Sequence, residues 1–381
     1  GGGGTNPIAG GTGNDTFIGG AGNDHISDAS GTDTVDYSDS SAGVDVDLSA
    51  GSASGGDANG DTLAGVENVV GTDYSDTLVG NGLNNVLNPG GLGADSVDGK
   101  ANVSGGDTLN ISLRAGGLEV DLSTQTVTGD DDGVDIAGVE NVIGTAGGDT
   151  LIGNGSANVL NGGAGNDTFV GDLGADTLIG GTGTDIANYS ASAVGITVTL
   201  GGGAGAGGTA AGDTLSGVEN VLGSAFADTI TGDDAANRLS GGSGNDALKG
   251  GDGDDSLDGG LGNDTLTGGA GDDVFAITNL GQKVVTDFTL GEDRVDLPDG
   301  LLDFAMVKPF LAQVGADVRI GITYNGALQS LTLQNVQLAD LGADDFVFVD
   351  DNTPHLDDGT DLADTMFGGR SNDTENRSEE H

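Results

Sequence analysis

The chain has 381 residues, including 77 glycines, and its 61 acidic residues against 10 lysines and arginines give a formal charge of −51. That charge argues against direct binding to nucleic acid or to anionic lipid, whose phosphates it would repel. There is no cysteine and therefore no disulfide, and no apolar run approaches the roughly 20 residues of a membrane-spanning helix. Because an acidic chain with 4% aromatic residues repels itself, we expect it to stay unfolded until cations neutralise it.

Nonapeptides with paired glycines and an acidic residue occur in three regions. The first begins with GGTGNDTFI at Gly10, continues as GGAGNDHIS, and ends in a degenerate element that carries Asp33. The second contains GGAGNDTFV from Gly162 and GDLGADTLI from Gly171. The third reads GGSGNDALK, GGDGDDSLD, GGLGNDTLT and GGAGDDVFA from 241 to 276. A nine-residue period fits neither a strand nor a helix, so it indicates one backbone unit laid down repeatedly.

A longer repeat is superimposed on the nonapeptides. The segment GVENV occurs three times, with its glutamate at Glu67, Glu140 and Glu219, and each copy follows a stretch of alternating apolar residues. A weaker nonapeptide, GGLGADSVD, follows Pro89 between the first two copies. We expect units of about 75 residues, each with a strand excursion followed by glycine-poor turns. The glutamates are interpreted as residues that orient a turn.

After Ile277 the pattern changes to alternating apolar and polar residues. The run VRIGITYNGALQSLTL places Asn325–Gly326 between two alternating stretches, which is typical of a hairpin with a type I′ turn. We interpret this region as a cap that covers the last rung of a solenoid. The expected segments are a first unit at 1–95, a degenerate second unit at 96–153, a third unit at 154–232, a regular array at 233–276, the cap at 277–349 and a flexible polar tail at 350–381.

Each nonapeptide supplies oxygen ligands. Glycines at positions one, two and four permit positive φ angles that turn carbonyl oxygens into the loop, and the aspartate at position six adds a carboxylate. Two nonapeptides make one full coil, so that Asp246 and Asp264 stack on the same edge while the apolar eighth residue faces inward. Oxygen ligands in a flexible cage favour calcium over zinc, copper or magnesium. The sequence therefore predicts several bound calcium ions.

The predicted metal ligands are the glycines at positions two and four and the aspartate at position six. In chain order they are Gly11, Gly13, Asp15, Gly20, Gly22, Asp24, Asp33, Gly163, Gly165, Asp167, Asp176, Asp185, Gly242, Gly244, Asp246, Gly251, Gly253, Asp255, Gly260, Gly262, Asp264, Gly269, Gly271 and Asp273. Elements with Asn85, Asn158 or Asn237 in place of aspartate, or with Gly174–Ala175 in place of Gly-Asn, are expected to bind metal weakly or not at all and to act as spacers.

On these GGxGxDxUx elements the chain resembles the RTX (repeats-in-toxin) proteins, which are secreted by bacteria. The resemblance implies an all-β fold, a parallel β-roll or β-helix with a β-rich C-terminal cap. It further implies a chain that is disordered in the calcium-poor cytosol, is exported by type I secretion machinery and folds in external calcium, in the medium or at the cell surface. The run DDFVFV resembles the end of a type I signal, although the chain continues beyond it from Asp350 to His381.

The sequence contains no catalytic motif of the HExxH, GxSxG or Walker type, and His25, at a variable repeat position, is interpreted as solvated. Two functions stay open. One is a structural, adhesive or surface-layer protein that binds calcium and either further copies of itself or a cell-surface polysaccharide; the three long units favour it. The other is the secretion and folding module of an exported protease, lipase or epimerase. The absence of a starting methionine favours it and suggests a piece of a longer chain.

Overall fold

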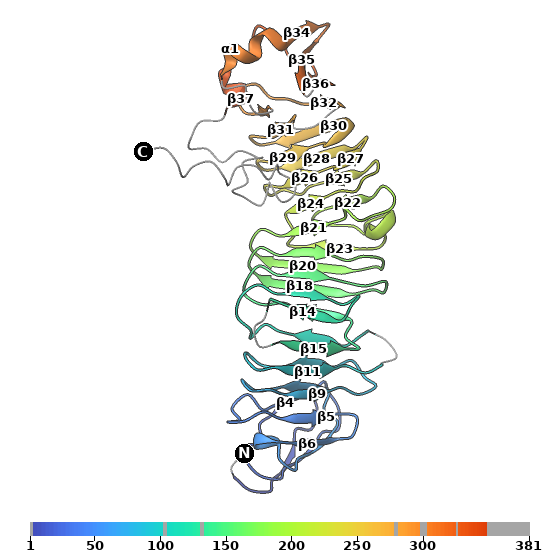
Figure 1. Ribbon diagram of the computed structural model, residues 1–381, viewed down its shortest axis with the longest axis vertical. Coiled ribbons are helices and arrows are strands. Elements are labelled where there is room, and N and C mark those ends of the chain that lie inside the picture. The colour runs from blue at the N-terminus through green and yellow to red at the C-terminus, as the bar shows by residue number, and fades with distance from the viewer. Residues whose placement is uncertain are drawn as a thin grey trace, which may run out of the picture. The chain divides into compact units, whose positions relative to one another are not determined.

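The structure is a computed structural model that describes residues 3–101, 105–129, 133–277, 281–297, 303–324 and 327–348. The described chain consists mainly of short strands (Figure 1), and it divides into two units. Unit 1 comprises Gly1–Asp185 and Asp213–Val218, and unit 2 comprises Ile186–Gly212 and the chain from Glu219 onward. The six segments expected from the sequence remain a prediction, and the tail at 350–381 lies outside the described residues.

Unit 1 contains two sheets of short strands. The first is parallel throughout and runs in the order β2 (Thr16–Phe17), β4 (Thr34–Asp36), β8 (Asn68–Val70), β10 (Val86–Asn88), β12 (Thr108–Asn110), β16 (Asn141–Ile143), β18 (Val159–Ala164), β20 (Thr177–Thr182) and β23 (Thr214–Ser216). The second runs in the order β1 (Pro7–Ala9), β3 (His25–Ser27), β7 (Thr62–Ala64), β6 (Ser52–Ser54), β5 (Asp45–Asp47), β9 (Thr77–Val79), β11 (Asp95–Asp98), β15 (Val134–Ala137), β14 (Thr126–Thr128), β13 (Glu119–Asp121), β17 (Thr150–Ile152) and β19 (Thr168–Val170).

Strands β6 and β14 are antiparallel to both of their neighbours. They are the return strands of hairpins whose first strands, β5 and β13, lie in the alternating stretches that precede GVENV. The strand excursions expected from the sequence are therefore present in unit 1. A short 3-10 helix, η1 (Gly56–Ala58), follows the first hairpin.

Unit 2 also contains two sheets. One is parallel and runs β21 (Ile186–Asn188), β24 (Asn220–Leu222), β26 (Arg238–Ser240), β29 (Ser256–Asp258), β31 (Val274–Ala276), β33 (Arg294–Asp296) and β37 (Phe346–Val347). The other runs β22 (Thr197–Thr199), β25 (Thr229–Thr231), β28 (Ala247–Asp252), β30 (Leu261–Ala270), β32 (Gly281–Val285), β36 (Ala327–Leu333), β35 (Asp317–Tyr324) and β34 (Leu311–Val314), with β27 (Ser243–Gly244) beside β30. The helical pieces are η2 (Gly208–Ala210), α1 (Phe304–Val307), η3 (Lys308–Phe310) and η4 (Ala343–Asp345).

The last strands of unit 2 form the expected cap. Strand β36 continues the parallel sheet beside β32, and β35 and β34 then extend it antiparallel. The predicted hairpin is confirmed, because β35 pairs with β36 and Tyr324 lies opposite Ala327. Its turn, Asn325–Gly326, lies outside the described residues.

The register of the parallel strands confirms that two nonapeptides make one coil. Leu248 of β28 lies opposite Leu266 of β30, the equivalent residue two nonapeptides later, as Leu160 lies opposite Leu178 in unit 1. Between β9 and β11 the coil is one residue longer, because Pro89 is inserted there, and Leu78 lies opposite Val97. Inserted residues thus change the spacing along the chain and leave the stacking of the strands intact.

The apolar eighth residue of each nonapeptide fills the space between the two sheets, as expected. Phe169, Leu178, Leu257, Leu266 and Phe275 are all 0% exposed. Full burial of such a side chain contributes about 1.5–3 kcal/mol. Each turn adds a similar increment, because in a solenoid a repeat contacts chiefly its neighbours.

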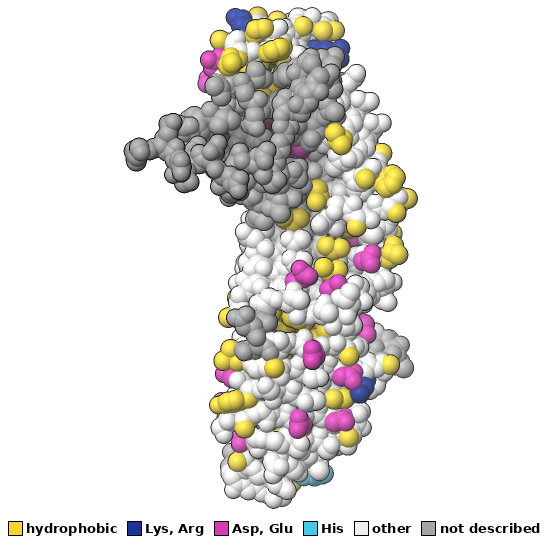
Figure 2. All heavy atoms as spheres, viewed as in Figure 1, with side chains coloured by type: hydrophobic (Ala, Val, Ile, Leu, Met, Phe, Trp, Pro, Cys, Tyr) yellow, Lys and Arg dark blue, Asp and Glu magenta, His cyan; other side chains and the backbone are white. Residues whose placement is uncertain are grey.

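The described surface on one face of the molecule has no single dominant chemistry. In Figure 2, acidic and apolar side chains are scattered over a surface made largely of backbone and of side chains that are neither apolar nor charged. Within the described ranges, no helix is long and apolar enough to cross a membrane. The distinctive chemistry lies in the turns between the strands.

Candidate metal-binding turns

The aspartates at position six form hydrogen-bonded ladders. The backbone N–H of Asp246 donates to Oδ1 of Asp264, one turn later, at 2.9 Å. The pairs Asp15/Asp33, Asp167/Asp185 and Asp255/Asp273 make the same bond. The predicted stacking of equivalent aspartates is thereby confirmed, and one oxygen of each of these later aspartates is committed to the backbone.

The other carboxylate oxygen is buried. In seven turns, Oδ2 of the aspartate has no hydrogen-bond partner in the part of the chain that the structure describes; these are the turns of Asp15, Asp24, Asp167, Asp176, Asp246, Asp255 and Asp273, here termed open turns. A buried carboxylate oxygen without a hydrogen bond is strongly unfavourable unless a positive charge neutralises it. The open turns therefore suit a hard cation such as calcium.

The glycines at positions two and four have the backbone conformation that the sequence predicted. Gly260 has φ +73° and Gly262 has φ +132°, and the other glycines predicted as ligands at these positions also have positive φ. A Cβ on Gly260 or Gly262 would overlap the carbonyl oxygen of Gly242 or Gly244 in the preceding turn. Glycine is therefore required here both by φ and by the close approach of a carbonyl group.

The glycine at position one has a different reason. The prediction of a positive φ at this position was wrong for Gly259 and for the first glycines of the other regular elements, whereas Gly90 of the weak nonapeptide has φ +90°. A Cβ on Gly259 would lie 2.5 Å from Oδ2 of Asp264. The first glycine thus leaves room for the carboxylate of position six in the same nonapeptide. This steric requirement does not follow from the conformational freedom of glycine.

The two carbonyl oxygens and the carboxylate oxygen of one turn can converge on a single cation. The ammonium group of Lys283 lies 2.9 Å from Oδ2 of Asp264 and 3.2 Å from the carbonyl oxygen of Gly262, and it also donates to the carbonyl oxygen of Gly260. These are the three ligand positions predicted from the nonapeptide. Their assignment as calcium ligands in the other turns remains a prediction.

Burial raises the pKa of five aspartates in the open turns. It raises the pKa of Asp176, Asp246 and Asp255 to about 7, and that of Asp167 and Asp273 to about 6, from an ordinary value of 3.8. Neighbouring aspartates contribute a smaller increase in each case. A cation and a proton therefore compete for these groups near neutral pH.

Three carboxylates meet near the start of unit 1. Ligand oxygens of Asp15, Asp28 and Asp33 all lie within 4.8 Å of one another. The N–H of Gly11 donates to Asp28 and is the main reason that the pKa of Asp28 is lowered. The sequence analysis missed Asp28, although an acidic residue at position one, where glycine is usual, was a readable signal.

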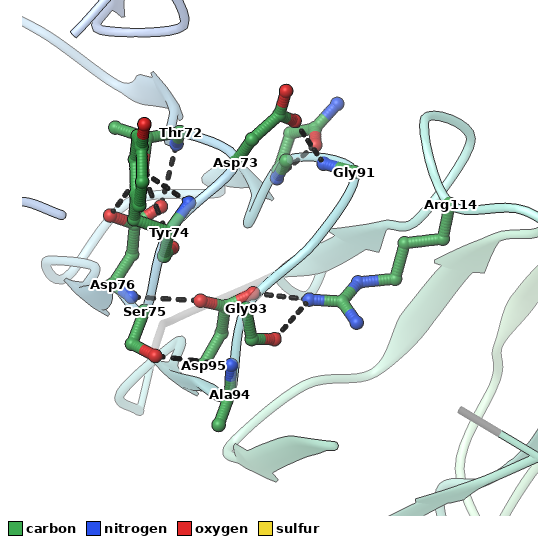
Figure 3. Close-up of polar contacts among 12 residues, drawn as sticks. Thr72, Asp73, Tyr74, Ser75, Asp76, Gly91, Gly93, Ala94, Asp95 and Arg114 are labelled. Atoms are coloured by element: carbon green, nitrogen blue, oxygen red, sulfur yellow. Dashed lines mark hydrogen bonds and ion pairs between the residues drawn. The ribbon is translucent and has the colours of Figure 1, made fainter. Parts of the chain in front are cut away.

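Glycine-poor turns satisfy both carboxylate oxygens without a cation. The N–H of Thr72 donates to Oδ2 of Asp76 at 2.6 Å and its hydroxyl donates to Oδ1 at 3.0 Å (Figure 3). Thr145 with Asp149, and Ser224 with Asp228, repeat this arrangement. At Asp61, Oδ2 accepts from the hydroxyl of Tyr37 at 3.0 Å. These are termed closed turns.

The asparagine turns are closed as well. The side-chain oxygen of Asn158 accepts from the N–H of Asn154, and its Nδ2 donates to the carbonyl oxygen of Glu140. Asn85 and Asn237 make the equivalent bonds. The carboxylate of Glu140 accepts from the N–H of Asp107 at 2.8 Å, as expected of a residue that orients a turn. This bonding supports the proposed spacer role of the asparagine turns.

A family model for the RTX calcium-binding nonapeptide repeat matches residues 1–35, 137–169, 152–187, 213–248, 240–275 and 358–374. These regions of the chain are RTX calcium-binding nonapeptide repeats. The matches cover less than half of the chain and include all seven open turns. RTX nonapeptide repeats bind calcium, and the all-β fold with its parallel sheets is the β-roll that the resemblance implied.

Solved structures with some similarity include two from Azotobacter vinelandii mannuronan C5-epimerase. The AlgE6R3 subunit is 27% identical over 34% of this chain and 83% of its own, with a TM-score of 0.28. The AlgE6R2 subunit is 26% identical over 33% and 94%, with a TM-score of 0.26. The extracellular lipase LipA from Serratia marcescens is 17% identical over 67% of this chain and 45% of the lipase, with a TM-score of 0.25. No curated protein matches the chain.

Proposed function

We propose that this RTX-repeat chain is an extracellular protein that leaves the cell unfolded through type I secretion machinery and folds when calcium fills its open turns. The observation that carries the proposal is the series of buried Oδ2 atoms for which the described residues supply no partner. Binding energy then becomes folding energy, because the ligand sets exist only when successive turns are stacked.

We further propose that the folded solenoid has a structural, adhesive or surface-layer role. Two features support this role. The described residues are occupied by strands, turns and cap, and the parallel sheets provide a stiff, extendable framework. Another copy of the chain or a cell-surface polysaccharide is the proposed partner.

The calcium-dependent step is tested with two adjacent aspartates. Asp255→Asn keeps the acceptor oxygen for the N–H of Asn237 and removes the buried charge of an open turn. Asp254→Asn removes the same charge from an exposed side chain. In a calcium titration followed by circular dichroism, the first variant is expected to bind one calcium ion fewer and to need more calcium to fold, whereas the second follows the unmodified protein. Equal behaviour of the two variants would contradict the site assignment.

The structural role is tested by light scattering on a sizing column, starting from chelated protein. The proposal predicts a large hydrodynamic radius without calcium, then compaction, then growth in mass as folded copies associate. Compaction to a stable monomer would instead favour a secretion and folding module. No response to calcium would reject the metal-dependent function altogether.

A further inference from the structure

Lys283 is a buried cation at the end of an aspartate ladder. Strand β32 pairs with β30 so that Lys283 lies opposite Asp264, in the place where the next turn would carry its own aspartate. The side chain is 0% exposed. Lysine is almost never fully buried unless its charge is paired, and here the ammonium group meets one carboxylate oxygen and two carbonyl oxygens.

Arg114, in the turn that follows β12, makes the equivalent contacts in unit 1. Its guanidinium donates to the carbonyl oxygen of Gly93 at 2.9 Å and to Oδ2 of Asp95 (Figure 3). Gly93 and Asp95 are positions four and six of the weak nonapeptide GGLGADSVD. The side chains of Arg114 and Asp95 are 2% and 0% exposed. A second nonapeptide thus presents its ligand oxygens to a side-chain cation.

The two cations share one relation to the repeat. Each contacts the position-six aspartate and the position-four carbonyl oxygen of a nonapeptide that lies earlier in the chain. Each contacts the same carboxylate oxygen, Oδ2, that in the open turns finds no partner within the described ranges. A positive side chain has therefore entered the position where the neighbouring turns suit a metal ion.

We propose that Arg114 and Lys283 are built-in cations that take the place of calcium, so that the turns of Asp95 and Asp264 fold without binding an ion. The inference rests on the proposed calcium-dependent folding and refines it, because it identifies two nonapeptide turns that bind no metal. Of the residues predicted as ligands, Gly260, Gly262 and Asp264 then bind the lysine of their own chain.

On the opposite edge of the regular array, the second aspartate ladder also ends in a residue that protein groups satisfy. That ladder passes from Asp255 to Asp273 and ends at Asp293. Oδ1 of Asp293 accepts from the N–H of Asp273, and Oδ2 accepts from the N–H of Thr289 at 2.7 Å. Both ladders therefore end in a residue whose charge is satisfied by protein groups. The last turn before the cap is a metal-independent surface on which the calcium-binding turns can stack.

The test is a count of calcium ions bound per folded chain at saturating calcium, by equilibrium dialysis and elemental analysis of the full-length protein. Lys283→Ala removes the ammonium group and exposes the ligand oxygens of Gly260, Gly262 and Asp264. It is expected to bind one ion more than the unmodified protein. The control, Lys249→Ala, removes the same charge from an exposed strand position and should leave the count unchanged.

An unchanged count in folded Lys283→Ala overturns the proposal, whatever happens to stability. Should that variant not fold, Lys283→Asp, which continues the aspartate ladder, is judged by the same count. Failure of both variants to fold at any calcium concentration also overturns it, since calcium would then be unable to replace the ammonium group. An unmodified protein that binds no calcium would reject the proposed function itself, and the two failures are thus distinguishable.

Discussion

Acid is expected to replace calcium in stabilising the fold. In the folded state, burial raises the pKa of Asp176, Asp246 and Asp255 to about 7 and that of Asp167 and Asp273 to about 6. Between these values and the ordinary value of 3.8, the folded state binds more protons than the unfolded state. The contribution to stability is therefore complete below about pH 4 and is lost as the pH rises through 6 to 7.

The size of the effect follows from the number of protons. Near about pH 5.5 the five carboxyls are mostly protonated in the folded chain and almost fully ionised in the unfolded chain, so folding takes up about four protons. Solvent screening at the rims of the turns lowers this number. The calcium-free protein should consequently gain folded structure on acidification from about pH 8 to about pH 5.

The assay is urea unfolding in a chelator, followed by circular dichroism at a series of pH values. The urea midpoint is expected to rise as the pH falls, and the pH dependence of the unfolding free energy gives the proton uptake. In saturating calcium the dependence should reverse, because protons then compete with the bound ions. A chelated protein whose stability is flat or increases with pH across this window would refute the assignment of the buried aspartates.

Two further predictions concern the turns and the core, both measured by urea unfolding in saturating calcium. Gly262→Ala is expected to destabilise the fold by about 3 kcal/mol or more, because Gly262 has a positive φ and an added Cβ would overlap a carbonyl oxygen. The control, Gly202→Ala, places the added Cβ in open space and should change stability by less than about 0.5 kcal/mol. Phe169→Ala is expected to lower the free energy of unfolding by about 3–5 kcal/mol, because the ring is fully buried. The control, Phe226→Ala, changes a side chain that is 46% exposed and should lower it by less than about 1 kcal/mol. Similar losses within either pair would contradict the stacking on which the site depends.

The features that repeat could be predicted from the sequence, and those that depend on an insertion could not. The ladder of Asp255 and its equivalents follows from a strict nine-residue period, which fixes both the coil and the inward position of the apolar residue. Lys283 could not be placed from the sequence because one inserted residue moves it out of phase with Asp264, and Arg114 could not because its coil is lengthened, so that Leu87 lies opposite Leu109. Asp28 was missed because it lies where the repeat has glycine, and its proximity to Asp33 depends on how the degenerate element that contains both residues folds.

Closed turns and open turns alternate in blocks, and this order has a physical consequence. In unit 1 the stretch that includes the turns of Asp76, Asn85 and Asp95 is satisfied by hydroxyl, amide and guanidinium groups, while open turns lie before and after it. In a solenoid each turn is stabilised mainly by the turn beside it. A closed block can therefore present a fixed strand register to the next open turn before any ion binds. Calcium then has to order one turn at a time, which lowers the conformational entropy cost of ordering the chain at each binding event.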